Sequence, residues 1–152
     1  MKDCYDLTVE AFNLAETYRC PVFIASNKEI GMTKESVEID FAAELTLINR
    51  SLAKSSENFL PFAVSEGRSV PDFLPIGDEI SVRQTSSTHG YDGYITTDAD
   101  VISKFQERLQ NKLYDVPVFY EEIITPGSDT LLICYGVTAR AAKDAVRCLS
   151  TS

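Results

Sequence analysis

The sequence predicts an α/β fold built on parallel strands. Two short, continuously apolar runs, 22–25 and 130–135, lie beside segments of helical periodicity. Such runs are typical of strands that are buried on both faces, as in parallel sheets. Gly136 and an amphipathic segment follow the second run, which predicts a strand–turn–helix unit. A lone unit of this kind cannot bury its strand, so we expect another polypeptide segment to cover it and the chain to associate.

The first element expected is a helix that ends near Tyr18. Asp3 and Asp6 are both candidate N-caps, and Arg19 supplies positive charge where the helix dipole favours it. Pro21 then stops the helix. The expected buried stripe consists of Leu7, Ala11, Leu14, Ala15 and Tyr18, and the expected outward face of Glu10, Asn13, Glu16 and Thr17.

The middle of the chain is expected to be largely irregular. We expect a loop over 26–31, a further helix over 41–52, and then a stretch punctuated by proline and glycine up to about residue 97. Asp98 or Asp100 caps the next expected helix, and Thr138 starts a final one that runs to about Leu149. The stripe of the helix after Asp98 consists of Val101, Ile102, Phe105, Leu109 and Leu113.

Charge and hydropathy limit the possible partners. The 152 residues include 14 Lys and Arg against 23 Asp and Glu, a formal charge of -9. Such a surface repels phosphate backbones and anionic lipid, so we expect neither nucleic acid nor membrane as a partner. No signal peptide is visible, and no apolar run approaches the roughly 18 residues of a membrane-spanning helix. A cytoplasmic location is expected.

Metal binding is not predicted. The four cysteines never approach Cys-x-x-Cys spacing, and His89 is the only histidine. Zinc and iron–sulfur sites need clustered thiolates or imidazoles. We therefore interpret Cys4, Cys20, Cys134 and Cys148 as buried, reduced thiols.

The turn Gly136–Thr138 is the one candidate ligand site. Backbone N–H groups of Gly136 and Val137 and the Thr138 hydroxyl lie at a predicted helix N-terminus, where an anion could bind. A single glycine is a far weaker signal than Gly-x-Gly-x-x-Gly. Thr138 as a simple N-cap explains the same residues without a ligand.

Two polar groups could indicate hydrolytic chemistry. Ser86, Ser87, His89 and Asp92 contain the residue types of a triad, but triad members must converge in space, and no nucleophile elbow is present. We favour a polar turn in which the imidazole forms a local hydrogen bond. The adjacent carboxylates Glu121–Glu122 would point to opposite faces of an extended segment and are expected to be solvated.

Three segments taken in order resemble a known enzyme family. Residues 3–22 resemble the end of the pyrimidine-binding domain in the α-subunit of 2-oxoacid:ferredoxin oxidoreductases. Residues 73–97 are similar to the following segment in the 2-oxoglutarate and archaeal-type members, and 132–143 to the start of their transketolase-C-like domain. The resemblance implies a domain boundary between 1–116 and 117–152, in an α/β fold.

The resemblance also implies a reaction and its cofactors. Members oxidatively decarboxylate a 2-oxo acid to an acyl-CoA, with thiamine diphosphate, Mg and Fe–S clusters in the complex and ferredoxin as electron acceptor. The family's substrate-facing segment has no counterpart among the 152 residues. We therefore expect a structural part of a hetero-oligomeric complex that binds none of these cofactors alone. The alternative is an independent α/β module that binds an anionic small molecule at Gly136–Thr138.

Overall fold

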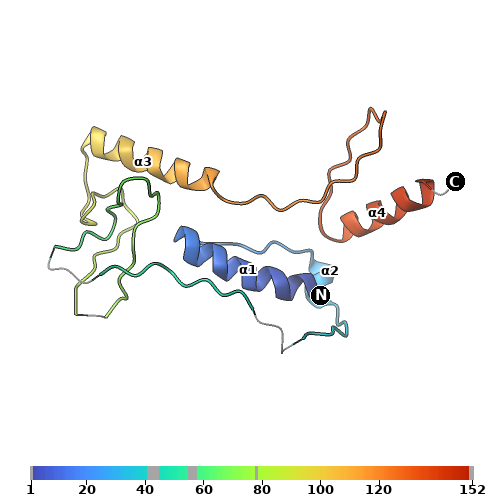
Figure 1. The fold of residues 1–152 in the computed structure, drawn as a ribbon, viewed down its shortest axis with the longest axis horizontal. Helices are drawn as coiled ribbons and strands as arrows, with labels where there is room; N and C mark the ends of the chain where they lie inside the picture. Colours follow the sequence, from blue (N-terminus) through green and yellow to red (C-terminus); the bar gives the residue numbers. More distant parts are fainter. Residues whose placement is uncertain (1, 41–44, 55–57, 78, 151–152) are drawn as a thin grey trace.

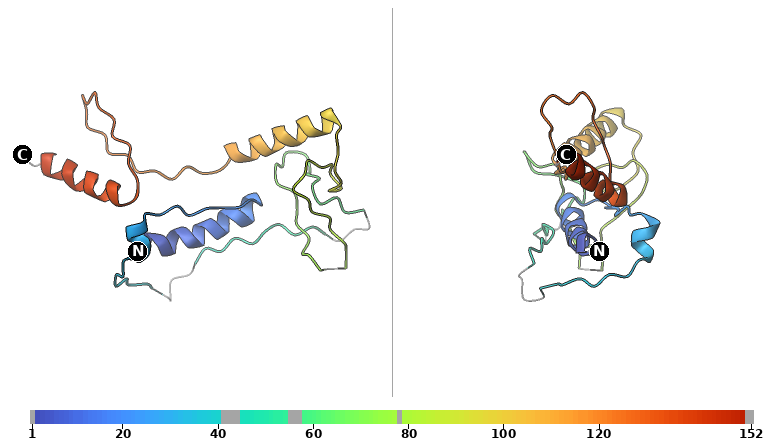
Figure 2. Two further views of the ribbon diagram at one scale, coloured as in Figure 1. Left: turned by 180° about the vertical axis from the view of Figure 1, so that it is seen from behind. Right: turned by 90° about the vertical axis from the view of Figure 1, so that its right-hand side faces the viewer.

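The computed structural model describes residues 2–40, 45–54, 58–77 and 79–150. Helix α1 lies in the middle of an elongated molecule, with α3 toward one end and α4 at the other (Figure 1). Of the irregular segment between α2 and α3, the later part, 58–77 and 79–97, gathers beside the start of α3, whereas the earlier part runs along α1, and the views in Figure 2 agree on this arrangement. The helices of the described residues are α1 (Lys2–Tyr18), α2 (Lys28–Met32), α3 (Ala99–Tyr114) and α4 (Gly136–Ser150).

Helix α1 ends at Tyr18, as its apolar periodicity predicts, but it begins before both expected caps. Asp3 lies in its first turn, where a negative charge still favours the helix dipole. The prediction that Asn13 faces outward is wrong, because this side chain is the buried residue of α1. Its amide donates to Thr46 O and accepts from Ile48 N, both at 2.9 Å. These bonds hold segment 45–52 against α1.

The helix expected over 41–52 does not form where the structure describes it. Residues 41–44 lie outside the described residues, and 45–52 contain no helix. Instead Leu52 forms a parallel bridge with Phe73, with hydrogen bonds of 2.9 Å from Ala53 N to Phe73 O and from Phe73 N to Ser51 O. Backbone pairing across the irregular segment satisfies donors that a helix would have satisfied internally.

Helix α3 begins as predicted. Asp98 is its N-cap, and one carboxylate oxygen accepts hydrogen bonds of 3.0 Å from Asp100 N and from Val101 N. This satisfies two of the donors that every helix start leaves unpaired. Helix α2 was not predicted, since 26–31 was expected to be a loop; five residues are too few to show a periodicity.

Neither apolar run expected to be a strand, 22–25 or 130–135, is paired within the described residues. Phe23 is 89% exposed and Ile133 is 84% exposed. The second run sits in a long arm between α3 and α4 that stands away from the rest of the chain (Figure 1). The parallel sheet, and the boundary near residue 116, therefore stay predictions.

The packed part of the molecule lies where the end of α1, the irregular segment and α3 meet, and we call it the packed end. Leu74, 5% exposed, is its buried aliphatic residue, accompanied by His89 at 5% and Lys112 at 7%. In the arm, residues 117–133 are all exposed. None of the helices in the described part of the chain combines the length and apolarity that crossing a membrane requires.

Candidate functional site

The turn at Gly136–Thr138 is occupied by a side chain from elsewhere in the molecule. Asn27, directly before α2, accepts a hydrogen bond of 3.3 Å from Val137 N through Oδ1. Gly136 has φ +60, and a Cβ there would collide with the same oxygen. An anion at this turn would have to displace Asn27. Since α4 begins at Gly136, Thr138 lies in its first turn, and the prediction that Thr138 is the N-cap is wrong.

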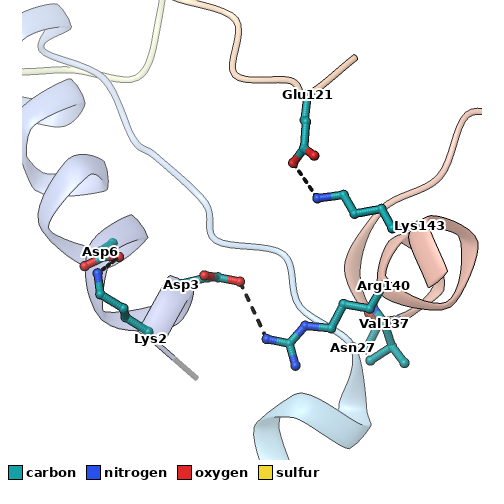
Figure 3. A network of polar contacts seen from close by, with 8 residues as sticks. All are labelled: Lys2, Asp3, Asp6, Asn27, Glu121, Val137, Arg140 and Lys143. Atoms are coloured by element: carbon teal, nitrogen blue, oxygen red, sulfur yellow. Dashed lines mark hydrogen bonds and ion pairs between the residues drawn. The ribbon is translucent and has the colours of Figure 1, made fainter. Parts of the chain in front are cut away.

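Ion pairs add to this contact (Figure 3). Arg140 of α4 lies 3.9 Å from an Asp3 carboxylate oxygen of α1. Lys143 of α4 pairs with Glu121 of the arm, so one of the two adjacent carboxylates has a partner, although both stay exposed as expected. Exposed ion pairs contribute little, typically 0–1 kcal/mol. The contacts of α4 with Asn27, Asp3 and Glu121 are thus polar.

His89 is packed between aromatic rings and not arranged for catalysis. Its ring centroid lies 3.9 Å from that of Phe62 and 4.8 Å from that of Phe105, which approaches edge-on. Nδ1 lies 3.0 Å from Gly90 O, which confirms the expected local hydrogen bond. Asp92 accepts from Tyr94 N at 2.9 Å, so its carboxylate serves the turn and does not orient the imidazole.

The cysteines are less buried than predicted. Cys4, Cys20 and Cys134 are half-buried free thiols, and Cys148 is exposed on α4. Across the described ranges, no three side chains of the His, Cys, Asp and Glu types come close enough to hold a metal ion. The donor set of this part of the chain therefore does not fit a magnesium ion or an iron–sulfur cluster.

Three cations meet at the packed end, a cluster that the sequence analysis missed. Arg19, directly after α1, donates through Nη1 to Pro61 O at 2.8 Å and to Asp72 O at 3.1 Å. Arg108 of α3 donates to Ser69 O at 3.0 Å. Its Nε is buried with no acceptor among the described residues. One turn further along α3, Lys112 is buried beside them.

Burial and mutual repulsion both act on this cation cluster. Desolvation lowers the pKa of Lys112, Arg108 and Arg19 from the usual values of these groups. The neighbouring guanidinium of Arg108 lowers the pKa of Lys112 further, whereas Cys20 acts in the opposite direction. In the described part of the chain, no carboxylate forms an ion pair with any of the three cations. Desolvation of cations that have no paired carboxylate costs stability.

A cavity of about 330 Å³ opens beside the cation cluster. The C-terminal end of α1 and the residues that follow it, Arg19 and Cys20, form one side, and the irregular segment forms the other. Two further arginines line it: Arg50, which pairs with Glu16, and Arg68, which lies 2.8 Å from an Asp72 oxygen. A chain with a net charge of -9 thus carries a local concentration of positive charge.

A signal for the cluster was present in the sequence. Phe105, Arg108 and Lys112 recur at spacings of three and four, so they share a face of α3 with the expected apolar stripe. Leu113, assigned to the stripe, is 61% exposed, while Lys112 takes the buried position. No sequence pattern predicts that Arg19 joins the cluster, because its contacts with Pro61 and Asp72 depend on tertiary structure.

Comparison with known proteins identifies related chains. No family model matches the sequence, and no solved structure matches it significantly. The 2-oxoglutarate synthase subunit KorA of Methanothermobacter thermautotrophicus is 30% identical over 151 residues, 97% of this chain and 40% of the relative. KorA of Methanocaldococcus jannaschii is also 30% identical, over 152 residues, with the same shares of the two chains.

A second type of relative is the ketoisovalerate oxidoreductase subunit VorB. The protein of Methanothermobacter marburgensis is 26% identical over 149 residues, 96% of this chain and 35% of the relative. The chain spans about two fifths of the length of the KorA relatives it matches. Nearly the whole of this chain is thus similar to part of the KorA and VorB subunits.

Proposed function

We propose that this chain is a structural part of the α-subunit of a 2-oxoacid:ferredoxin oxidoreductase, contributing packing surface and no catalytic groups. The complex would oxidatively decarboxylate a 2-oxo acid to an acyl-CoA. Thiamine diphosphate, Mg and Fe–S clusters would be held by other parts of that complex. The observation that carries the proposal is the apolar surface left open along the arm.

The arm carries large apolar side chains that nothing in the described chain covers. Leu131 is 82% exposed and Ile133 84%, in the run whose composition is typical of a strand buried on both faces. Single exposed apolar residues are ordinary, but a contiguous patch marks an interaction site. The other large apolar residues exposed along the arm are Val118, Phe119, Tyr120, Ile123, Ile124, Leu132 and Tyr135.

The described side chains support a non-catalytic role. His89 is enclosed by two phenylalanine rings, and Asp92 is bonded to the backbone of its own turn. General acid–base catalysis needs a titratable group within reach of a substrate proton. At the turn that the alternative hypothesis uses, Asn27 already accepts from Val137 N, which disfavours an independent anion-binding module there.

The first test is activity of the purified chain. We expect no reduction of a viologen dye that depends on both a 2-oxo acid and CoA, because the proposed role places the cofactor sites and the reactive groups on other parts of the complex. Dye reduction is measured with the chain alone and with a complete oxidoreductase as the positive control. Robust turnover by the chain alone would contradict the structural role.

The second test is association, measured by size-exclusion chromatography with light scattering. We expect the molar mass to rise above that of one chain with increasing concentration, since the arm offers unpaired backbone and apolar side chains. Ile133→Asp should shift the distribution toward a monomer. Thr125→Asp, which adds the same charge at an exposed polar position of the arm, should not. A clean monomer of the unmodified chain at all concentrations would oppose the proposal.

A further inference from the structure

The two arginines of the cation cluster are held in place by hydrogen bonds, but no carboxylate of the described residues pairs with the charges of the cluster. Arg19 uses both Nη1 hydrogens on Pro61 O and Asp72 O, and its guanidinium also lies over the rings of Phe62 and Phe73. No other described residue accepts a hydrogen bond from it. A guanidinium has five N–H donors. The Nε hydrogen and both Nη2 hydrogens are therefore left for an acceptor that these residues do not supply. Backbone carbonyls orient the group, yet they carry no full negative charge.

Of the three cations in the cluster, Lys112 has the fewest partners to offset its positive charge. The residue as a whole is 7% exposed, and no described residue forms a hydrogen bond or an ion pair with its ammonium group, although the nitrogen itself is not fully buried. Lysine is almost never buried without a partner, because desolvation of an ammonium group is expensive. A cation in this position raises the affinity of the neighbouring space for an anion, since Coulomb attraction is strong where water is scarce.

The space beside the cluster has the size and the donors for a small anion. Arg19 belongs to both the cluster and the 330 Å³ cavity, which lies at the lower end of the range of ligand pockets. Arg50 and Arg68 line the same cavity. Their partners Glu16 and Asp72 offset two of the five positive charges, which leaves an excess of three.

We propose that this cavity binds the phosphate or carboxylate group of a small molecule, with Arg19 as the central contact. The planar fork of an arginine matches both oxyanions with two parallel hydrogen bonds. Arg50 and Arg68 line the cavity from the irregular segment, and Arg108 and Lys112 contribute positive charge from behind Arg19. This site goes beyond the structural role proposed above and is separate from the turn at Gly136–Thr138.

The test is titration of the full chain with inorganic phosphate, by calorimetry and by the midpoint of thermal unfolding, with sodium chloride at matched ionic strength as reference. We expect a saturable heat and a higher midpoint in phosphate. Arg19→Gln should weaken the affinity at least tenfold. Arg83→Gln, which removes an equal charge from a residue stacked on Tyr94 outside the cavity, should leave the affinity unchanged.

Lys112→Met keeps the proposal testable if Arg19→Gln does not fold. Methionine retains most of the aliphatic stem and removes the partly desolvated charge, so this variant should raise the unfolding midpoint without phosphate. It should also reduce the increase that phosphate produces. Thr138→Ala should leave both quantities unchanged, because the turn of α4 is not the site. Phosphate stabilisation no greater than that of chloride, or equal in Lys112→Met, would overturn the proposal.

Discussion

The packed end and the arm use similar residues in opposite ways. At the packed end, an irregular, proline- and glycine-rich segment encloses Leu74, His89 and Lys112 against α3. The arm is far richer in consecutive apolar residues, and it encloses nothing: residues 117–133 are exposed throughout. Hydrophobic composition alone therefore does not decide which part of this chain is buried.

The packed end and the arm differ in whether their backbone N–H and C=O groups form hydrogen bonds. At the packed end, Phe73 N donates to Ser51 O and Gly90 N donates to Tyr94 O, each at 2.9 Å. Arginine side chains bind several of the remaining carbonyls. An irregular segment can be buried only when its backbone groups are satisfied in this way. In the arm, the apolar run has no neighbouring strand to satisfy its backbone within the described chain.

The largest expected effect is on the free energy of unfolding when a phenylalanine is replaced by alanine, at the packed end in one variant and in the arm in the other. Phe62→Ala should lower the free energy of unfolding by about 2–3 kcal/mol, less than at a fully buried site because Phe62 is half-buried. It removes the ring that packs against His89 at a tilt of 38°. Phe119→Ala in the arm is the matched control and should change stability by less than about 0.5 kcal/mol. Urea unfolding measures both; equal losses would contradict the comparison.

Gly136→Ala should loosen the attachment of the arm. Alanine in the left-handed region costs about 1–2 kcal/mol, and here its Cβ would also collide with Asn27 Oδ1. Gly127→Ala has a similar backbone penalty, at φ +80, but its Cβ meets open space. Amide hydrogen exchange should therefore show lower protection of α4 in Gly136→Ala than in Gly127→Ala. Equal protection would exclude the Asn27 contact.

Asp98→Ala should destabilise α3 by about 1 kcal/mol, since it removes the acceptor of two backbone hydrogen bonds. Because α3 carries Arg108 and Lys112, the loss should appear in global unfolding, measured with urea. Asp100→Ala is the control: it removes only a charge in the first turn and should cost about 0.3–1 kcal/mol. A cost for Asp98→Ala no larger than that of the control would argue against the cap.

The smallest expected effect is a loss of stability in acid at the packed end. The hydrogen bond from the Ser51 hydroxyl, followed by the contact with Arg68, lowers the pKa of Asp72 below its usual value. The ionised form is favoured in the folded state. This contribution is therefore complete above roughly pH 3.9, the unperturbed value, and is lost as the pH falls through the folded pKa. Unfolding midpoints measured between pH 5 and pH 2 should fall less in Asp72→Asn than in the unmodified chain; parallel curves would contradict this.

Local signals identified α1, α3 and α4, but they missed the short α2 and predicted a helix that residues 45–52 do not form. Periodic apolar residues and the Asp98 cap predict α3, and the last periodic segment predicts α4 apart from its first two residues. They failed at Asn13, which was expected to face outward and is buried, and they did not include Lys112 in the stripe of α3, where it takes a buried position. In both cases a segment distant in sequence, not the helix itself, determines the environment. Likewise, Gly136 was recognised as a turn, but its contact with Asn27 spans nearly the whole chain.

By itself the sequence determined where α1, α3 and α4 form, that the chain is acidic, and which subunits it resembles. Helix formation depends on neighbours three and four residues away, so a local pattern is sufficient to predict it. Only the tertiary structure decided that Arg19, Arg108 and Lys112 meet beside one cavity, and that Asn27 occupies the turn before α4. These contacts join residues far apart along the chain, and no local periodicity encodes which of them come together.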